Sequence, residues 1–423
     1  MYKRRGFMEQ NGAHKKIRRL LILMSLGIAY GFMFVLPYMK STFYDQMIAA
    51  MEVNNEQLGS LMSIYAIACT VSYLPGGWIA DRFKPKTVLL FSTFGNAILC
   101  FIFMMTYKNF FMVRMIWLLC AFTGGFAFWP AIMKGIRLLG DEEEQGRMFG
   151  IFEGMNGVAS LLVSFIMVGL LSLFSGDLIT GFKGAVGSMG VLCLISGVLI
   201  LILFNDKLVY GEENGESEKF NTRQFMQTFK IPGVWIMAIL MFGYVTTSAV
   251  ASYLTPYSTG VLGISAVAAA TIGTIRTYGC RFLGGPIGGW IADKVFHSVC
   301  KEQMLGHILC IIGIGVFLVI PGGTPTGIIA GLLILVGVFM FTVKGTTFSV
   351  QQELGIPLHV SGSAVAIATL IGYLPDMFMH TMFGNWLDRY GNDGYTRIFL
   401  YGIAITVVCV VVAFIGVKVS KRR

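Results

Sequence analysis

Charged residues are scarce in this chain. Only 13% of its 423 residues are Asp, Glu, Lys or Arg, while 55% are hydrophobic. A soluble protein carries about 25% charged residues, so this composition excludes a large soluble domain. The net charge of +10 does not indicate a nucleic-acid-binding protein, because the basic residues lie at the ends of apolar runs and not in one arm. We therefore expect the lipid bilayer to be the partner of this surface.

Several chemical signatures are also absent from the sequence. The eight cysteines are scattered, and neither a Cys-x-x-Cys pair nor a histidine cluster occurs, so we expect no disulfide framework and no metal site. No Gly-x-x-x-x-Gly-Lys-Ser/Thr run is present, which excludes a nucleotide-binding loop of that type. The sequence thus predicts no catalytic residues and no cofactor, and it favours a protein that is not an enzyme.

Long apolar runs fill most of the chain. At about 20 residues per membrane span, they predict twelve transmembrane helices and an all-α membrane protein. The first run follows a basic segment, as in a signal peptide, but it is long enough to span the membrane and we expect it to be retained. The expected spans are 20–39, 57–79, 87–106, 110–134, 148–172, 185–204, 232–257, 266–291, 303–320, 327–350, 361–383 and 397–417.

One hexapeptide occurs twice. Gly-Gly-Trp-Ile-Ala-Asp stands at 76–81 and again at 288–293, which is 212 residues later (288 − 76). An identical string at half the chain length indicates two similar halves, each a bundle of six membrane helices. We expect domains at 1–204 and 232–423, joined by a cytoplasmic linker at 205–231 that is rich in Gly, Glu and Ser.

The chemistry of the hexapeptide explains its position at a helix end. Small residues let two helices approach closely in lipid, and Trp suits the membrane–water boundary. The Asp that follows can pair with a cation or cap the next helix. We expect this motif to act in gating, through the residues Gly77, Asp81, Arg82, Gly289, Asp293 and Lys294.

The motif resembles the loop signature of the major facilitator superfamily, Gly-x-Leu-Ala-Asp-Arg-x-Gly-Arg-Lys. Lys84 and Pro85 depart from that pattern. The stretches around Phe128-Trp129-Pro130 and 384–395 resemble the sugar-phosphate and organophosphate permease branch, including bacterial permease-like proteins of poorly defined substrate. The resemblance implies two pseudo-symmetric six-helix bundles. The arginines that this branch uses in its first and seventh helices are missing, so its phosphate site is not implied here.

Basic residues alternate between the predicted loops. They crowd the N-terminal tail, the loops on the same side and the C-terminal tail, whereas the opposite loops hold Lys40, Lys108, Lys183, Arg389 and Arg397. This asymmetry predicts a multi-pass protein of the bacterial inner membrane with both termini in the cytoplasm.

Charges within the spans are the candidate functional groups, since each costs about 2.5–3.5 kcal/mol to insert. The cores of the third, sixth and twelfth spans carry none, and that of the ninth carries only His307. Lys134 and Lys344 are each followed by Gly and stand 210 residues apart (344 − 134). They face one another across a central cavity in one interpretation, and they extend to the lipid headgroups in the other.

We expect Lys134, Lys344 and Arg276 to bind substrate, with Arg281 either beside them or in a packing ion pair. Glu153 and Asp376 are candidate proton carriers or counter-ions, because a carboxyl group in apolar surroundings binds a proton more readily; each alternatively neutralises a nearby cation. The aromatic candidates for stacking on a sugar ring are Tyr30, Trp129 and Tyr244.

These features predict a monomeric secondary transporter of a small polar, anionic organic solute, such as a sugar derivative, sugar acid or organophosphate, moved with a proton or a counter-anion. Two alternatives remain open. One is a proton-coupled exporter of lipophilic compounds, and the other is a sensor that binds ligand without transporting it.

The predicted orientation can be tested with reporter fusions. A reporter fused after Gly215 or after Arg423 should be active only if it is of a type that works in the cytoplasm, because both sites follow basic segments. Activity of a periplasmic reporter at either site would contradict the predicted topology.

Overall fold

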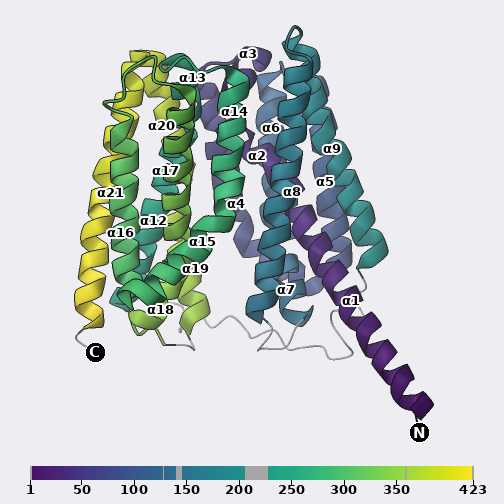
Figure 1. Cartoon of the computed structure of the whole chain (residues 1–423). Helices are drawn as coiled ribbons and strands as arrows, with labels where there is room; N and C mark the ends of the chain where they lie inside the picture. Colours follow the sequence, from purple (N-terminus) through teal and green to yellow (C-terminus); the bar gives the residue numbers. More distant parts are fainter. Residues whose placement is uncertain (1, 127, 140–144, 205–226, 358–359, 422–423) are drawn as a thin grey trace. The chain divides into compact units, whose positions relative to one another are not determined.

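The computed structural model describes residues 2–126, 128–139, 145–204, 227–357 and 360–421. Within these ranges, the side chains of residues 2–16, 73–82, 126, 130, 134, 137–138, 145–147 and 149 are not described. All regular secondary structure in the described ranges is helical, as Figure 1 shows. The prediction of an all-α protein is therefore confirmed.

The first half of the chain forms long helices with short turns between them. In order they are α1 (Tyr2–Met33), α2 (Val35–Tyr38), η1 (Met39–Ser41), α3 (Tyr44–Met51), α4 (Asn55–Arg82), α5 (Pro85–Thr106), α6 (Phe110–Ala121), the π-helical segment η2 (Phe122–Phe126), α7 (Phe128–Leu139), α8 (Gln145–Leu173) and α9 (Leu178–Leu203).

The second half follows the same plan with more interruptions. Its helices are α12 (Pro232–Ser252), α13 (Leu254–Gly260), α14 (Ala266–Thr274), the π-helical η4 (Ile275–Gly279), α15 (Cys280–Trp290), the π-helical η5 (Ile291–Phe296), α16 (Val299–Val316), α17 (Thr326–Thr346), η6 (Thr347–Ser349), α18 (Val350–Glu353), α19 (Ser361–Gly372), α20 (Leu374–Tyr390) and α21 (Asp393–Ser420).

Nine helical segments among the described residues are long and apolar enough to cross a membrane. The three other expected spans coincide with α4, with the run from α6 to α7 and with the run from α14 to η5. The twelve predicted spans are therefore consistent with the helices observed, although the last two of these runs are broken by π-helical turns.

Capping residues explain where the helices depart from the predicted spans. α9 begins at Leu178, seven residues before the predicted span, because the Asp177 side chain accepts a hydrogen bond from the Thr180 amide. α16 begins at Val299 because Ser298 caps it in the same way. The earlier start brings Glu302 into the first turn of this helix, where its side chain is buried.

The chain divides into two compact units. One contains Met1–Pro37 and Ala68–Glu218, and the other contains Tyr38–Ile67 and Lys219–Arg423. Residues 38–67 lie within the predicted N-terminal domain, yet they pack with the second unit. The chain passes from one unit to the other within α4. The predicted linker lies outside the described residues as far as residue 226. The predicted domain boundaries stay a prediction.

In the first unit, α1 packs against α8 and α5 packs against α9 (Figure 1). Glycines bring the backbones of α1 and α8 together. A Cβ atom on Gly27 would lie 2.7 Å from the Phe152 carbonyl oxygen, and one on Gly31 would lie 2.6 Å from the Asn156 carbonyl oxygen. Small residues at a helix contact allow this approach.

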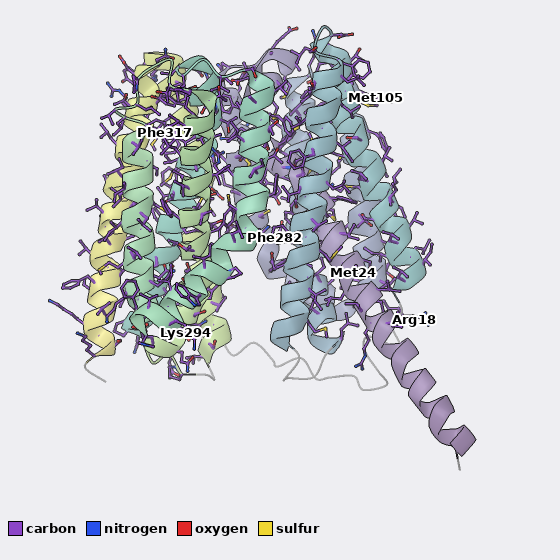
Figure 2. The ribbon with its side chains drawn as sticks, in the orientation of Figure 1. Arg18, Met24, Met105, Phe282, Lys294 and Phe317 are labelled. Atoms are coloured by element: carbon purple, nitrogen blue, oxygen red, sulfur yellow. The ribbon has the colours of Figure 1, made fainter. Side chains whose placement is uncertain are left out.

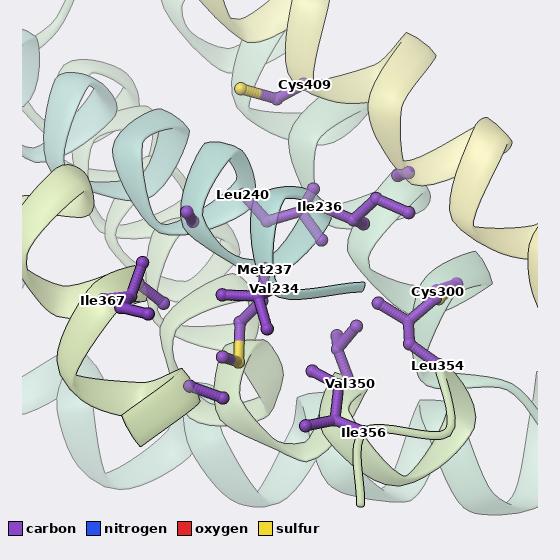
Figure 3. Close-up of a cluster of buried hydrophobic side chains, with 14 of the residues drawn as sticks. Val234, Ile236, Met237, Leu240, Cys300, Val350, Leu354, Ile356, Ile367 and Cys409 are labelled. Atoms are coloured by element: carbon purple, nitrogen blue, oxygen red, sulfur yellow. The ribbon is translucent and has the colours of Figure 1, made fainter. Parts of the chain in front are cut away.

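In the second unit, α12 is surrounded by α19, α20 and α21. A cluster of buried side chains joins α12, α16, α18, α19 and α21 (Figure 3). Its members include Val234, Met237, Cys300, Leu354 and Ile367. None of the eight cysteines forms a disulfide, and all are buried, where they contribute to the cores as small apolar side chains.

In the second copy of the hexapeptide, one of the two glycines makes a close helix contact and the other does not. A Cβ atom on Gly288 would lie 2.7 Å from the Thr342 carbonyl oxygen of α17, whereas one on Gly289 would meet nothing within 4 Å. Lys294, just after the motif, lies at the opposite end of this unit from Phe317 (Figure 2). The expected close helix contact is thus made by Gly288.

This asymmetry predicts that Gly288→Ala is destabilising and Gly289→Ala is not. The methyl group on residue 288 would have to push α15 away from the α17 backbone, at a cost of about 1–3 kcal/mol. At residue 289 it enters open space and improves helix propensity by up to about 1 kcal/mol. Thermal unfolding in detergent should show a clear decrease in Tm for Gly288→Ala only; equal shifts for the two variants would contradict this packing.

Candidate functional site

Predicted site residues of the second unit gather around Tyr244 on α12. The Lys344 ammonium lies 5.6 Å from the centre of the Tyr244 ring and 5.7 Å from that of Phe341. The Tyr244 hydroxyl hydrogen-bonds with Ser248 and lies within electrostatic range of Tyr373, Arg281 and Asp376. Two cations, a carboxylate and aromatic rings thus come together from α12, α15, α17 and α20.

Local structure places each cation of this group. Lys344 stands in the last turn of α17, where the helix dipole favours a positive charge. Arg281 follows η4, whose π-helical turn shifts the helical register and so changes the directions in which nearby side chains point. Both side chains are partly exposed. A cation beside an aromatic ring is suited to a polar or anionic ligand with an apolar face.

Arg276, within η4, takes a different position. Its side chain is 2% exposed, and its Nη2 donates to Thr255 Oγ1 at 3.2 Å and to the Ser41 carbonyl oxygen at 3.4 Å. Its Nη1 has no partner among the described residues. Arg276 therefore holds the end of η1 in this structure, and its predicted contact with substrate stays a prediction.

The first unit holds a corresponding aromatic group. Tyr30 lies 5.3 Å from Trp129, 5.5 Å from Phe152 and 4.3 Å from Phe34, measured between ring centres. Tyr30 and Tyr244 stand 214 residues apart (244 − 30), close to the repeat offset. The two tyrosines therefore occupy similar positions on the first and seventh spans; Tyr30 lies beside Trp129 of the fourth span, and the Tyr244 ring lies near Lys344 of the tenth.

Glu153 on α8 is held close to Tyr30's helix. The Asn156 amide donates to Glu153 Oε2 at 3.1 Å, and the Ser160 hydroxyl donates to the Gly31 carbonyl oxygen at 3.2 Å. The side chain of Lys134 lies outside the described residues, as do the side chains of Asp81 and Arg82. Gly77 lies in the same part of α4, of which only the backbone is described.

The second copy of the gating motif can be followed. Gly289 makes no close contact, while Asp293 and Lys294 are exposed in η5. The expectation that this Asp caps the next helix is wrong for the second copy, because Ser298 caps α16. Glu353 completes that cap.

The Glu353 carboxylate accepts from the Cys300 amide at 3.0 Å and from the Ser298 hydroxyl at 2.6 Å. A carboxylate from α18 thus closes the N-terminus of α16.

Sequence reasoning missed a buried polar group at the other end of this unit. Lys40, assigned to an outer loop, is 2% exposed, and its Nζ lies 2.7 Å from His380 Nδ1. His380 Nε2 in turn lies 3.3 Å from Asp376 Oδ1. The spacing of four residues between Asp376 and His380 is a signal on a helix, but nothing near Lys40 in the sequence points to residue 380.

A second carboxylate cap was also missed. Asp388 of α20 accepts from the Asn55 amide at 3.1 Å and from the Glu56 amide at 2.8 Å, so it closes the N-terminus of α4. Asn54 and Gln57 bond each other's amides and complete the cap. Every free amide of this helix start is therefore satisfied.

Glu302 of α16 forms a third buried group. It accepts hydrogen bonds from Thr346 and Gln303, and the Gln303 amide also donates to the Val343 carbonyl oxygen at 2.7 Å. This network joins α16 to α17 behind Lys344. Its position beside a packed helix contact indicates a structural role.

Comparison with known proteins agrees with this arrangement. The sequence profile of the Major Facilitator Superfamily matches residues 20–379. The chain belongs to this superfamily. It is therefore a membrane transporter of small molecules and not an enzyme, and the predicted resemblance is confirmed.

Related sequences come from a bacterial inner membrane. The chain is 27% identical over 408 residues to the inner membrane protein YqcE of Escherichia coli (strain K12), with 95% of each chain covered. It is 26% identical over 381 residues to the inner membrane protein YihN of the same organism, covering 88% of this chain and 89% of YihN. The membrane sensor protein UhpC of that organism is 18% identical over 295 residues, covering 66% of this chain and 65% of UhpC.

Among solved structures, a bacterial homologue of the human lysosomal transporter Spinster, in an inward-facing and unoccupied conformation, has a TM-score of 0.75 with this chain. Its identity is 15%, and the match covers 96% of this chain and 98% of that one. A likeness at this identity shows the fold. Together with the apolar helices and the relatives, it identifies a multi-pass inner-membrane protein.

The carboxylate cap on α4 leads to a prediction. Asp388→Ala removes the acceptor for two helix-end amides, and loss of a cap costs about 1 kcal/mol. Hydrogen exchange at the start of α4 should become about fivefold faster, while exchange in α9 stays unchanged. Asp393→Asn, an exposed substitution at the start of α21, is the matched control; an equal effect in this control would contradict a specific cap.

Proposed function

We propose that the chain is a secondary transporter that moves a small polar, anionic organic solute by alternating access. The observation that carries this proposal is the group formed by Lys344, Arg281 and Tyr244 in the second unit. Two cations beside an aromatic ring match a solute that has both an acidic group and a sugar-like ring face. A sugar acid, a sulfonated or other sugar derivative, and an organophosphate all have this chemistry.

The first unit supplies the aromatic complement in this proposal. Tyr30 and Trp129 provide ring faces at the positions that repeat symmetry relates to Tyr244 and Phe341, and Lys134 corresponds to Lys344. Glu153 and Asp376 are the acidic groups available to a coupled proton or to the cations themselves. The glycines and charges of the two hexapeptides, including Asp81 and Asp293, would bias the conformational equilibrium and not ligand affinity.

The alternation of basic loops supports cytoplasmic termini and a transport path between the periplasm and the cytoplasm. We treat the protein as a monomer, since one chain supplies both halves of a site formed by repeats.

A second candidate function is ligand sensing without transport, which the similarity to the membrane sensor protein UhpC favours. The two functions differ in one measurable property. A transporter exchanges labelled for unlabelled ligand across a vesicle membrane, and a sensor binds the same ligand without counter-flow.

The substrate class can be tested by ligand binding. A thermal-shift screen against sugar phosphates, sulfonates, uronates and neutral sugars should select an acidic ligand. Lys344→Gln should then weaken that ligand about tenfold or more, because a charge-assisted hydrogen bond contributes about 1.5–3 kcal/mol, and it should leave a neutral sugar unaffected. Lys134→Gln should do the same.

Lys418→Gln is the matched control, because this exposed lysine lies at the end of α21 over the Phe414 ring. If Lys134→Gln and Lys344→Gln bind every ligand as the unchanged protein does, the anion proposal fails. A neutral or lipophilic substrate would then be the better interpretation.

A further inference from the structure

Lys40, His380 and Asp376 form a line of buried titratable groups in the second unit. Lys40 Nζ lies 2.7 Å from His380 Nδ1, and His380 Nε2 lies 3.3 Å from Asp376 Oδ1. The exposed fractions of the three residues are 2%, 4% and 8%. Lys40 comes from η1, whereas the other two stand one turn apart on α20.

Tyr253 fixes the geometry of this line. Its hydroxyl donates to the His380 carbonyl oxygen at 2.8 Å and accepts from Lys40 Nζ at 3.2 Å. Its ring lies 4.4 Å from the same ammonium nitrogen and is stacked on the His380 ring at 6.3 Å between centres. The ammonium is thus directed at His380 Nδ1.

The number of protons in the line follows from these contacts. With Lys40 as an ammonium, which donates hydrogen bonds and accepts none, His380 Nδ1 is the acceptor and the ring carries its proton on Nε2, facing Asp376. The charges are then one ammonium and one carboxylate, which balance. A second proton on Nδ1 would place two cations 2.7 Å apart in apolar surroundings, where their repulsion is strong.

We propose that the His380–Asp376 pair is a proton-binding site of the transporter, and that the proton and the Lys40 ammonium replace each other on it. The pair requires one positive charge to balance the carboxylate. With Lys40 in place, the ammonium supplies that charge; with Lys40 withdrawn, a proton on the imidazole supplies it. One proton is therefore released to water when Lys40 returns, and one is taken up from water when Lys40 withdraws.

The exchange involves a segment that packs with the second unit. Residues 38–67 belong by sequence to the N-terminal repeat but pack with the second unit. Beyond Lys40, this segment is held by Thr255, which donates to the Ser41 carbonyl oxygen at 3.0 Å, and by Asp388 at the start of α4. Proton binding at His380 would thus favour withdrawal of this segment, and its return would expel the proton. This inference rests on the proposed transport cycle and names a proton as its coupling ion.

Other titratable groups face the same region and must be separated from His380. From α3 come Tyr44 and Asp45, from α20 comes Asp388, from α21 comes Tyr395, and from η4 comes Arg276 through its contact with Ser41. On the side of the substrate group, Tyr244 lies within electrostatic range of both Arg281 and Asp376.

Asp45 is the competing group that acid would affect first. Burial raises the pKa of Asp45, against the opposing effect of the Thr259 hydroxyl, which donates to it at 2.6 Å. A carboxyl group whose pKa is raised in the docked segment binds a proton more tightly when docked. Acid would therefore favour docking through Asp45, which is the opposite sign to the effect through His380.

The test measures docking directly, without any substrate. Spin labels are placed on exposed positions of α3 and α21 through Ala49→Cys and Thr396→Cys, and the distance between them is measured from about pH 5 to about pH 9, which covers the titration of histidine. The eight natural cysteines are buried, and the protein without the two substitutions gives the background.

The full-length protein should show the docked distance alone at high pH and a longer distance as the pH falls. Because one proton replaces one ammonium, the ratio of the two populations should change by up to about tenfold per pH unit. In His380→Gln this pH dependence should disappear, since the Gln amide oxygen still accepts from Lys40 but takes up no proton. Lys40→Met should also lose it, because no cation then competes with the proton.

His297→Asn is the matched control, because it removes an exposed imidazole at a left-handed position that Asn tolerates, and it should keep the full pH dependence. Asp45→Asn should keep or steepen it. Retention of the pH dependence in His380→Gln, or in Lys40→Met should the histidine variant not fold, would overturn the proposal. So would a distance that does not change with pH.

A failure of the anionic-substrate proposal would leave these results unchanged, because no ligand is present in this measurement. The two proposals are thus tested separately.

Discussion

Polar groups that lie in apolar surroundings must find partners inside the protein, and this constraint organises the described structure. Within the helices, backbone amides and carbonyls bond to one another. At two helix starts that are exposed or part-buried, carboxylates from other helices accept from the free amides, Asp388 for α4 and Glu353 for α16. Buried cations follow the same rule: Lys40 and Arg276 each donate to groups on a neighbouring segment. Charges that lack water bind segments of the chain together.

The two repeats are similar in some aromatic positions and differ in their charged groups. Some aromatic positions of the two halves are similar, since Tyr30 and Tyr244 each lie on the first span of a half, Tyr30 beside Trp129 and Tyr244 near Lys344. The charged groups do not correspond in the same way. His380 and Asp376 occupy the eleventh span, and the fifth, its counterpart, carries Glu153 with an asparagine partner. The two repeats therefore carry different charged groups on their corresponding spans.

Much of the fold could be predicted from the sequence. The hexapeptide repeat and the apolar runs were sufficient for the all-α class and the superfamily, because both depend on composition over about 20 residues. Boundaries failed where a single capping side chain extended a helix, as Asp177 and Ser298 do. From the sequence, Lys344, Arg281 and Asp376 could be identified only as charges within spans. Their position around Tyr244 could not be predicted.

Contacts that join distant segments could not be predicted in this way. In the sequence, Lys40 resembles any other basic residue at the end of a predicted span. Its burial depends on His380, which is 340 residues away. The role of Asp388 likewise depends on a helix start that precedes it by 333 residues. Local pattern contains no information on such pairs, since any loop residue could have been the partner.

The caps that close α4 have a consequence for how the protein is made. The carboxylate that caps its first amides is synthesised 333 residues later, and the imidazole that contacts Lys40 is synthesised 340 residues after Lys40. During synthesis, the segment 38–67 therefore remains without its final partners until the eleventh helix has entered the membrane. Contacts so far apart in the chain form slowly and late. A chain that stops before residue 388 therefore lacks the carboxylate that caps the start of α4.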